Sequence, residues 1–538
     1  MKRLSEKAAS FQLRLNSNTA NAVLYPHFSM IANLHRTYIL EITVFVCGAL
    51  VMIFEIIGSR IVSPFIGTST YVWTSLIGVI LGSLSLGYWL GGRIADRRPD
   101  ARVLGSIIFL AGGLISATVL IKEVFLSSIA GATIGLELKA VIASLVLFGP
   151  ASVCLGIVTP FAVRLKMTSL DRTGRTVGRL YALSTVGSIV GTFAAGFLMI
   201  PFVGSVRTLY IIAGLLMALA FLVAPLAFSA RNVAAGVLLL LGIAASETYI
   251  RFLRVNSGVY DIDTEYSRVQ VLTSRDPVTG KPIRAMATDP YFVQSAAFLD
   301  SDELVLEYSK FYHLIRHFRP DLENTLIIGG AGYSYPKEYL KTYPQARLDV
   351  AEIDPQMTEI ARRFFGLDDH PRMTIFHEDA RMYINRAEAG QYDAVLMDAF
   401  GSLFSVPHHL TTVEAVRELS RILKDDGVII FNLGSAITGP SSGFLQAELR
   451  TYKEIFPHVH LFKVRPDYTD ERLQNLVIVA SKNSAPAALT SEDTQISGLL
   501  VRRYAADVPL TRSILTDDLA PVEYYNSIAQ NIYLANPR

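Results

Sequence analysis

The stretch Thr325-Leu326-Ile327-Ile328-Gly329-Gly330-Ala331-Gly332 decides the fold of the C-terminal half of this chain. Residues 325–328 predict a short buried strand, and the glycines predict a tight turn before a helix that begins near Pro336. Glycine has no Cβ, so Gly329, Gly330 and Gly332 let the backbone approach a ligand closely. By itself the loop is a weak signal, because it lacks the third glycine of a dinucleotide fingerprint.

Downstream of this loop, short apolar stretches alternate with helical patterns. Further strands are predicted at 347–353, 373–376, 394–397 and 427–431. Such alternation predicts a parallel sheet covered by helices, with ligands bound beyond the carboxyl ends of the strands. We therefore expect an α/β Rossmann-like domain. It would cover residues 321–482, after a small β-rich subdomain at 258–320 and before an extension at 483–538.

An acidic residue follows each of three successive predicted strands. Glu352 lies 22 positions after Gly330 and suits hydrogen bonds from both ribose hydroxyls of a nucleoside. Asp379 suits the exocyclic amine of adenine, and Asp398 would face the reacting centre. The alternative is that all three carboxylates are solvated strand ends. Their recurrence at three strands favours a nucleoside site.

The N-terminal half has a different character, because long apolar runs fill roughly the first 250 residues. Over the whole chain, hydrophobic residues make up 51% and charged residues 18%. A membrane-crossing helix needs about 20 apolar residues, and most of these runs are long enough. The stretch 124–136 is too short and is expected to be re-entrant or a loop. We expect a cytoplasmic segment at 1–36 and a multi-span α-helical membrane domain at 37–250, with apolar runs at 39–59, 71–91, 103–121, 140–163, 180–202, 207–228 and 233–249.

Positive charge predicts the orientation of these segments in a bacterial inner membrane. The N-terminus is basic, and so are the loops after the second segment (Arg93, Arg97, Arg98, Arg102) and after the fourth (Arg164, Lys166, Arg172, Arg175, Arg179). The N-terminus should therefore be cytoplasmic. Seven spans would then put the C-terminal domain outside, and six or eight would put it inside. Nucleotide cosubstrates are cytoplasmic, which favours a cytoplasmic domain.

Several partners are excluded or left open by composition. The net charge of +2 argues against nucleic acid, because little basic excess can neutralise phosphates. Both cysteines, Cys47 and Cys154, lie in apolar runs, so neither a disulfide framework nor a metal site is expected. Charges within or beside the spans, at Glu41, Glu55, Arg60 and Glu247, indicate either a substrate or proton path or residues that fix helix packing. The run 92–98 resembles the loop motif of major facilitator transporters, which leaves transport open.

The C-terminal motifs resemble those of spermidine synthases. The similar segments are 326–332, 350–354, 378–380, Asp398 and the run 409–414 that begins with His409. With its membrane half, the whole chain resembles the bacterial membrane-fused spermidine synthase-like proteins. The segments 398–400, 410–412 and 515–523 are similar to that subgroup.

The resemblance implies transfer of an aminopropyl group from decarboxylated S-adenosylmethionine, a cosubstrate, to putrescine or a related amine. In that reading Glu352 holds the ribose, and Asp379 and Ala380 hold the adenine. Asp398 positions and deprotonates the amine, while Gln294 and His409 contact substrate. A protonated amine cannot attack carbon, so a carboxylate must help the proton leave. No permanently bound cofactor or metal is implied, the lipid bilayer is a partner, and a homodimer is left open.

Three departures from the family pattern keep other functions open. The glycine loop lacks an aspartate, Gly401 stands where the family has a second aspartate, and a tyrosine-histidine-glutamate run is not preserved at 306–308. His408 and His409 follow Asp398 and are expected to shape the site, with a replacement base as the alternative. The competing functions are another S-adenosylmethionine-dependent transferase, such as a methyltransferase, and a non-catalytic transporter or sensor.

Overall fold

The computed structural model describes residues 38–67, 69–132, 134–167, 173–224, 230–289, 292–399 and 406–535. The expected N-terminal segment at 1–36 and Gly401 lie outside these ranges. The chain divides into two compact units, each described by itself. The helical unit comprises Met1–Gly58, Ile77–Leu120 and Ser144–Ile243. The mixed unit comprises Ser59–Leu76, Ile121–Ala143 and Ala244–Arg538.

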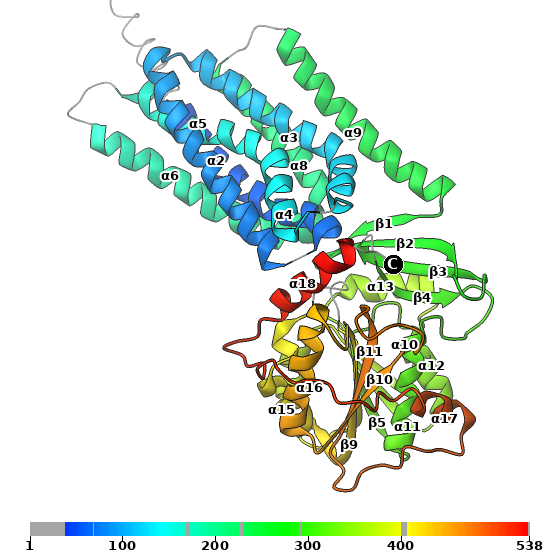
Figure 1. Ribbon diagram of the computed structural model, residues 1–538. Coiled ribbons are helices and arrows are strands. Elements are labelled where there is room, and N and C mark those ends of the chain that lie inside the picture. The colour runs from blue at the N-terminus through cyan, green and yellow to red at the C-terminus, as the bar shows by residue number, and fades with distance from the viewer. Residues whose placement is uncertain are drawn as a thin grey trace, which may run out of the picture. The chain divides into compact units, whose positions relative to one another are not determined.

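Long apolar helices make up the first half of the chain (Figure 1). By length and composition, six described helices could cross a membrane, and a pair bent by 54° would make a seventh. The bent pair is α4 (Leu136–Leu147) and α5 (Gly149–Lys166). The others are Tyr38–Ile66, α2 (Thr70–Arg97), α3 (Ala101–Ala130), α6 (Thr173–Ala194) continued by η2 (Ala195–Met199) and α7 (Ile200–Phe202), α8 (Ser205–Val223) and α9 (Ala230–Asn256).

The expectation for 124–136 was wrong over its first part. Helix α3 continues to Ala130, and a turn between Gly131 and Gly135 leads into α4. The reason is local, since Val124–Ala130 contains no proline or glycine and has nothing to end the helix.

Ion pairs gather one set of helix ends within the helical unit. The buried carboxylate of Glu41, near the start of the first described helix, pairs with Lys166 at the end of α5. Its other oxygen lies 2.8 Å from a guanidinium nitrogen of Arg179, near the start of α6. Arg164 of α5 contacts Asp96, near the end of α2, at 3.1 Å. The basic ends predicted from sequence therefore lie together.

A small antiparallel sheet opens the C-terminal half. Its order is β1-β2-β3-β4, with bounds Tyr260–Asp263, Arg268–Arg275, Pro282–Asp289 and Phe292–Phe298. One face packs on helix α13 (Pro355–Phe365), where Val269, Val271 and Met286 meet Met357 and Ile360. This contact places the turn between β1 and β2 near the start of α13.

The large sheet has the order β10-β11-β9-β8-β5-β6-β7. In chain order its strands are β5 (Asn324–Ile328), β6 (Arg347–Ala351), β7 (Met373–Phe376), β8 (Tyr392–Met397), β9 (Leu423–Ser435), β10 (His458–Lys463) and β11 (Gln474–Ser481). Five of them, β5 to β9, pair in parallel as predicted. Two strands that were not predicted, β10 and β11, extend one edge of the sheet, where β11 runs antiparallel to both β9 and β10. A loop without a crossover helix joins β10 to β11, and such a connection makes an antiparallel pair.

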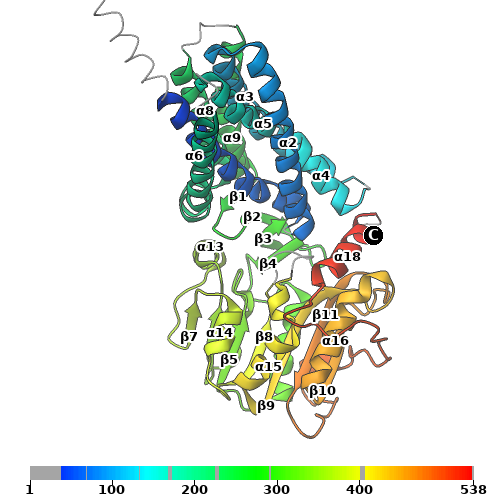
Figure 2. The ribbon, with the colours of Figure 1, turned by 90° about the vertical axis from the view of Figure 1, so that its left-hand side faces the viewer.

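Helices cover both faces of the large sheet (Figures 1 and 2). One apolar core packs α14 (Ala380–Arg386), α15 (Val413–Ile422) and α16 (Gly443–Ile455) against the sheet. A second core holds α12 (Ser334–Thr342), α17 (Thr494–Leu500) and the run α10 (Glu307–Lys310), η3 (Phe311–Leu314) and α11 (Ile315–Phe318). The last described helix is α18 (Val522–Ala535). Burial on both faces explains why the central strands read as continuous apolar runs.

Candidate functional site

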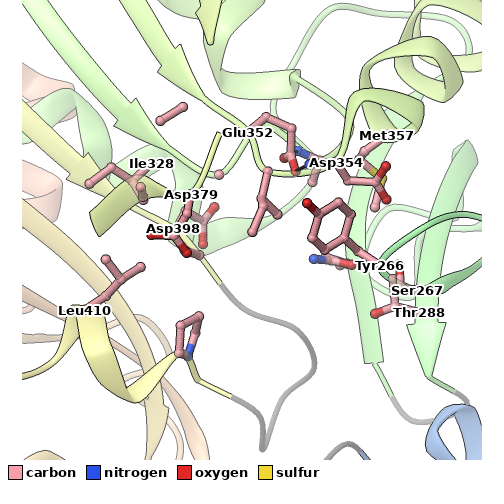
Figure 3. Close-up of a pocket in the computed structure, with 18 of the residues that line it drawn as sticks. Tyr266, Ser267, Thr288, Ile328, Glu352, Asp354, Met357, Asp379, Asp398 and Leu410 are labelled. Carbon is pink, nitrogen blue, oxygen red and sulfur yellow. Dashed lines mark hydrogen bonds between the residues drawn. The ribbon is translucent and has the colours of Figure 1, made fainter. Parts of the chain in front are cut away.

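A cavity of about 310 Å³ opens at the carboxyl edge of the large sheet, and all its lining residues belong to the mixed unit. Figure 3 shows Glu352, Asp379 and Asp398 on one side of it and Tyr266, Ser267 and Thr288 on the other. Seven residues predicted from sequence line the cavity: Gln294, Gly329, Glu352, Asp379, Ala380, Asp398 and His409. The other two, Gly330 and Gly332, are not among the lining residues.

The glycines of the loop after β5 are needed for close packing. Gly329 has φ +96°, and a Cβ there would lie 2.4 Å from the carbonyl oxygen of Asp398. At Gly332 a Cβ would lie 2.4 Å from Oγ of Ser295. Gly330 is closed off by the Tyr333 ring, so protein atoms fill the space where ligand approach was predicted. Of the three glycines, Gly329 alone lines the cavity, and it also packs against Asp398.

Glu352 holds this loop in place. Its Oε2 accepts hydrogen bonds from the backbone N–H of Gly330 at 2.8 Å and of Ala331 at 3.2 Å. Its Oε1 accepts one from the N–H of Asp354 at 2.9 Å. Burial raises the pKa of this carboxyl, and the three backbone donors oppose that rise. A carboxylate oxygen can accept more than one hydrogen bond, so Glu352 can still accept from a ligand in the cavity.

Asp379 joins helix α14 to His409. Its Oδ1 caps the helix by accepting from the N–H of Arg381 at 2.8 Å and of Met382 at 3.3 Å. Its Oδ2 lies 3.1 Å from Nε2 of His409, in the short helix η4 (His408–Leu410). The contact fixes His409 at the cavity wall, whereas His408 is exposed and outside the lining. Ala380 follows the cap and is buried.

Asp398, directly after β8, is half-buried and is held by two side-chain donors. Tyr308 of α10 donates to its Oδ2 at 3.1 Å, and the side-chain amide of Asn432 donates to its Oδ1 at 3.0 Å. Burial raises the pKa of Asp398 to about 6, although these hydrogen bonds act to lower it. A carboxyl that titrates just below neutral pH is largely ionised at pH 7 and can accept a proton, as a general base must.

The partners of Asp398 were missed in the sequence. Burial and the neighbouring carboxylate raise the pKa of Tyr308 well above its ordinary value, so its hydroxyl stays protonated and donates. Asn475 of β11 donates to Oδ1 of Asn432 at 3.1 Å, which turns the amide nitrogen of Asn432 toward Asp398. One signal was present, because Asn432 is the single polar residue in the apolar run 428–433 of β9.

The end of the first described helix also lines the cavity, through Arg60, Ser63, Pro64 and Gly67. The guanidinium of Arg60 lies 3.0 Å from Oδ1 of Asp263 and donates to the carbonyl of Glu265 at 2.9 Å. It also donates to the carbonyl of Thr264. The sequence assigned Arg60 to a span end or a substrate path, and its partner roughly 200 residues away was beyond any local pattern.

Comparison with known proteins gives matches of different extent. Residues 305–485 match the model of the spermine/spermidine synthase domain. A polyamine aminopropyltransferase of Vibrio vulnificus is 33% identical over 171 residues, which are 31% of this chain and only 54% of that protein. Polyamine aminopropyltransferase 2 of Ralstonia nicotianae is 24% identical over 442 residues, 75% of this chain and 80% of that protein. An alignment of that length extends into the helical unit.

Among solved structures, a probable spermidine synthase from Corynebacterium glutamicum is similar with 23% identity and a TM-score of 0.38. The match covers 47% of this chain and 88% of that one.

Proposed function

This chain belongs to the spermidine synthase-like family, and from that premise we propose that it transfers an aminopropyl group from decarboxylated S-adenosylmethionine to an amine. The observation that carries the proposal is the state of Asp398. Its carboxylate is half-buried, lines the cavity, is held by donors on both oxygens and has its pKa raised by desolvation to about 6. Those are the properties that deprotonation of an alkylammonium requires.

In this proposal the nucleoside lies along the carboxyl edge of the sheet. Glu352 accepts hydrogen bonds from the ribose hydroxyls, and Asp379 accepts from the adenine amine beside buried Ala380. Gln294 on β4 and His409 lie at the cavity wall, where they contact the substrates. Because Glu352 and Asp379 already accept backbone hydrogen bonds, their positions are set before the ligand binds, which lowers the entropy lost on binding.

The chemical step then needs little beyond alignment and proton removal. Asp398 takes a proton from the bound ammonium, and the freed nitrogen lone pair attacks the carbon attached to the sulfonium. The new C–N bond forms as the C–S bond breaks. The electron pair of the C–S bond leaves with sulfur, which gives the neutral thioether of methylthioadenosine. Holding the two reactants in line supplies much of the rate enhancement.

We also propose that the protein is a multi-pass membrane protein with seven crossings. The pairs at Glu41 and Asp96 join the start of the first described helix and of α6 to the ends of α2 and α5. At the opposite ends of these helices, the N–H of Thr70 donates to Glu523 at 2.7 Å, and that of Leu136 donates to Asn531 at 2.9 Å. We take these contacts as support for a crossing by the bent pair, and seven crossings would put the C-terminal domain on the face opposite the N-terminus.

Cosubstrate supply favours a cytoplasmic domain, and the charge bias favours cytoplasmic basic ends. With seven crossings, the C-terminal domain and the basic helix ends cannot both be cytoplasmic. Labelling of single cysteines from each face of the membrane decides between them.

Binding tests the proposed function directly. We would titrate the full chain in detergent with decarboxylated S-adenosylmethionine, S-adenosylmethionine and methylthioadenosine, and repeat each titration on Asp379→Ala. We expect the decarboxylated form to bind most tightly and the variant to weaken all three. A preference for S-adenosylmethionine would replace aminopropyl transfer by methyl transfer, and no binding would overturn both.

A further inference from the structure

Part of the outer wall of the cavity comes from the end of an apolar helix. Ser63, Pro64 and Gly67 line the cavity at the end of the apolar helix Tyr38–Ile66. The same cavity is lined by Asp398 and Glu352 at the sheet edge. One compartment therefore runs from the proposed base to the end of a helix suited to crossing a membrane.

The residues of this wall that belong to the helix lie in its last two turns. The apolar run of the helix ends near residue 59, and Ser63 follows four residues later. At about 1.5 Å per helical residue, Ser63 lies about 6 Å beyond the end of the apolar run. The polar headgroup layer of a bilayer extends roughly 5–8 Å beyond the hydrocarbon on each side. In the proposed membrane crossing, a wall at this position would lie level with the amines of phospholipid headgroups.

The wall is a built structure. Arg60 binds the segment after β1 through Asp263 and the carbonyls of Thr264 and Glu265. Oγ1 of Thr264 accepts from the N–H of Tyr266 at 3.2 Å and from that of Ser267 at 2.9 Å, which fixes the turn. Tyr266 lines the cavity from this turn, beside Asp354 in Figure 3.

Charge differs between the two walls. Arg60, Ser63, Pro64, Gly67, Tyr266, Ser267, Arg268 and Thr288 line the outer wall and include no carboxylate. The acidic partners of the arginines, Asp263 for Arg60 and Asp261 with Glu123 for Arg268, are not among the lining residues. All the lining carboxylates, Glu352, Asp354, Asp379 and Asp398, belong to the sheet edge and the start of α13.

This distribution suits an acceptor with an anion beside its amine. A free diamine carries a second cation, which would find no carboxylate among the outer-wall residues themselves. A phosphoethanolamine group has its phosphate next to the amine, so the phosphate would meet the arginines while the amine points to Asp398. The same chemistry could come from free phosphoethanolamine, but the helix end favours the lipid.

We propose that the acceptor is the primary amine of an aminophospholipid headgroup, of the phosphatidylethanolamine class. The proposal rests on the proposed aminopropyl transfer and names its acceptor. The headgroup ammonium gives a proton to Asp398, and its nitrogen forms a bond to the aminopropyl carbon as the C–S bond breaks. The products are methylthioadenosine and a lipid that carries a secondary amine and a new terminal ammonium.

The test uses the full chain in nanodiscs with decarboxylated S-adenosylmethionine. One set contains phosphatidylethanolamine in phosphatidylcholine, and the other contains phosphatidylcholine alone, to which putrescine or free phosphoethanolamine is added. Methylthioadenosine release and the lipid mass are measured together. We expect both signals with phosphatidylethanolamine, and a weaker release with either soluble amine.

The other possible results of the nanodisc assay each overturn a different part of the proposal. Release with putrescine and no modified lipid would overturn the lipid acceptor and leave aminopropyl transfer standing. Equal use of free phosphoethanolamine would overturn the membrane as its source. No release with any amine would overturn the proposed function together with this inference.

Variants locate the effect at the outer wall. In Arg60→Gln we expect the rate with lipid, relative to the rate with putrescine, to fall roughly tenfold, the size of one lost charge-assisted hydrogen bond. Ser63→Phe narrows the cavity at the outer wall, keeps the Arg60 contacts and should lower the same ratio. This second variant keeps the inference testable if Arg60→Gln does not fold. Arg164→Gln removes an arginine that pairs with Asp96 outside the cavity and should leave the ratio unchanged. Equal ratios in all three would overturn the inference.

Discussion

The two walls of the cavity are built in different ways. The inner wall carries Glu352, Asp379 and Asp398, each directly after a strand, and local hydrogen bonds fix Glu352 and Asp379. The outer wall depends on Arg60, whose partner Asp263 is 203 residues away in sequence. The inner wall suits nucleoside binding and proton transfer, which the sheet topology supports in many proteins. The outer wall is the part that can make this chain selective for its acceptor.

The proposed seven membrane crossings give the largest expected effect, an all-or-none labelling pattern. Both cysteines, Cys47 and Cys154, are buried and would be replaced by alanine. Single cysteines would then be placed at Arg98, after α2, and at exposed Asp425 of the large sheet. With a membrane-impermeant maleimide on intact cells and on inverted vesicles, we expect the two positions to react from opposite faces.

Labelling of both positions from the same face would contradict seven crossings. Labelling of Asp425→Cys only in inverted vesicles would make the domain cytoplasmic, in agreement with its cosubstrate and against the charge bias.

At the inner wall, the proposed base should have the largest effect on rate. Asp398→Asn keeps the shape of the side chain and removes its ability to accept a proton, so we expect kcat to fall by about 10²–10⁴. Donor binding should be nearly unchanged, because Glu352 and Asp379 are intact. Methylthioadenosine release measures the rate and calorimetry measures binding. Asp425→Asn, at an exposed carboxylate, is the control, and equal rates in the two variants would exclude Asp398 as the base.

Asp393, near the other end of the same strand, should affect stability instead. It is buried, lies 3.0 Å from Arg319 and accepts hydrogen bonds from the N–H groups of Glu323 and Asn324, both at 2.8 Å. Asp393→Ala leaves Arg319 without this partner, and loss of one member of a buried pair costs about 3–5 kcal/mol. Thermal unfolding of the purified chain measures the loss.

The direction of the pH effect follows from the same contacts. The backbone donors, with Lys424 and Arg319, lower the pKa of Asp393 in the folded chain, so its stabilising contribution is lost as pH falls through that lowered pKa. Stability equal to that of the starting protein at pH 7 would show that Asp393 is not structural.

The residues of the inner wall could be predicted from the sequence, whereas the contacts of the outer wall could not. Strand 373–376 was confirmed residue for residue, and the acidic residues after the strands converge on one cavity, because strand ends follow from local apolar pattern and topology. The predicted strand 427–431 is in fact thirteen residues long, since pairing with β11 extends it. The tyrosine-histidine-glutamate run of the family is not preserved at 306–308, yet tertiary packing brings Tyr308 of this segment to Asp398. The contact of Arg60 arises only from tertiary folding, and no local rule could find it.

The smallest predicted effect is a shift in pH dependence, and it concerns the chain Asn475–Asn432–Asp398. Asn432 donates to the ionised form of Asp398 and so lowers its pKa. Asn432→Ala removes that donor and should raise the pKa of Asp398 above its value of about 6. A charge-assisted hydrogen bond of about 1.5 kcal/mol corresponds to a shift of about one pH unit.

Because the base must be ionised to act, the acid limb of the kcat/KM profile should move to higher pH by that amount. Activity at pH 6 should then fall more than activity at pH 8. In Asn475→Ala the side-chain amide of Asn432 can still donate to Asp398, but Asn475 no longer orients it. The acid limb of the kcat/KM profile should therefore move less than in Asn432→Ala. A merely structural role for Asn432 would lower activity equally at every pH and leave the limb in place. That result would show that Asn432 does not affect the pKa of Asp398. The main reason for treating the inner wall as preorganised for proton transfer would then be lost.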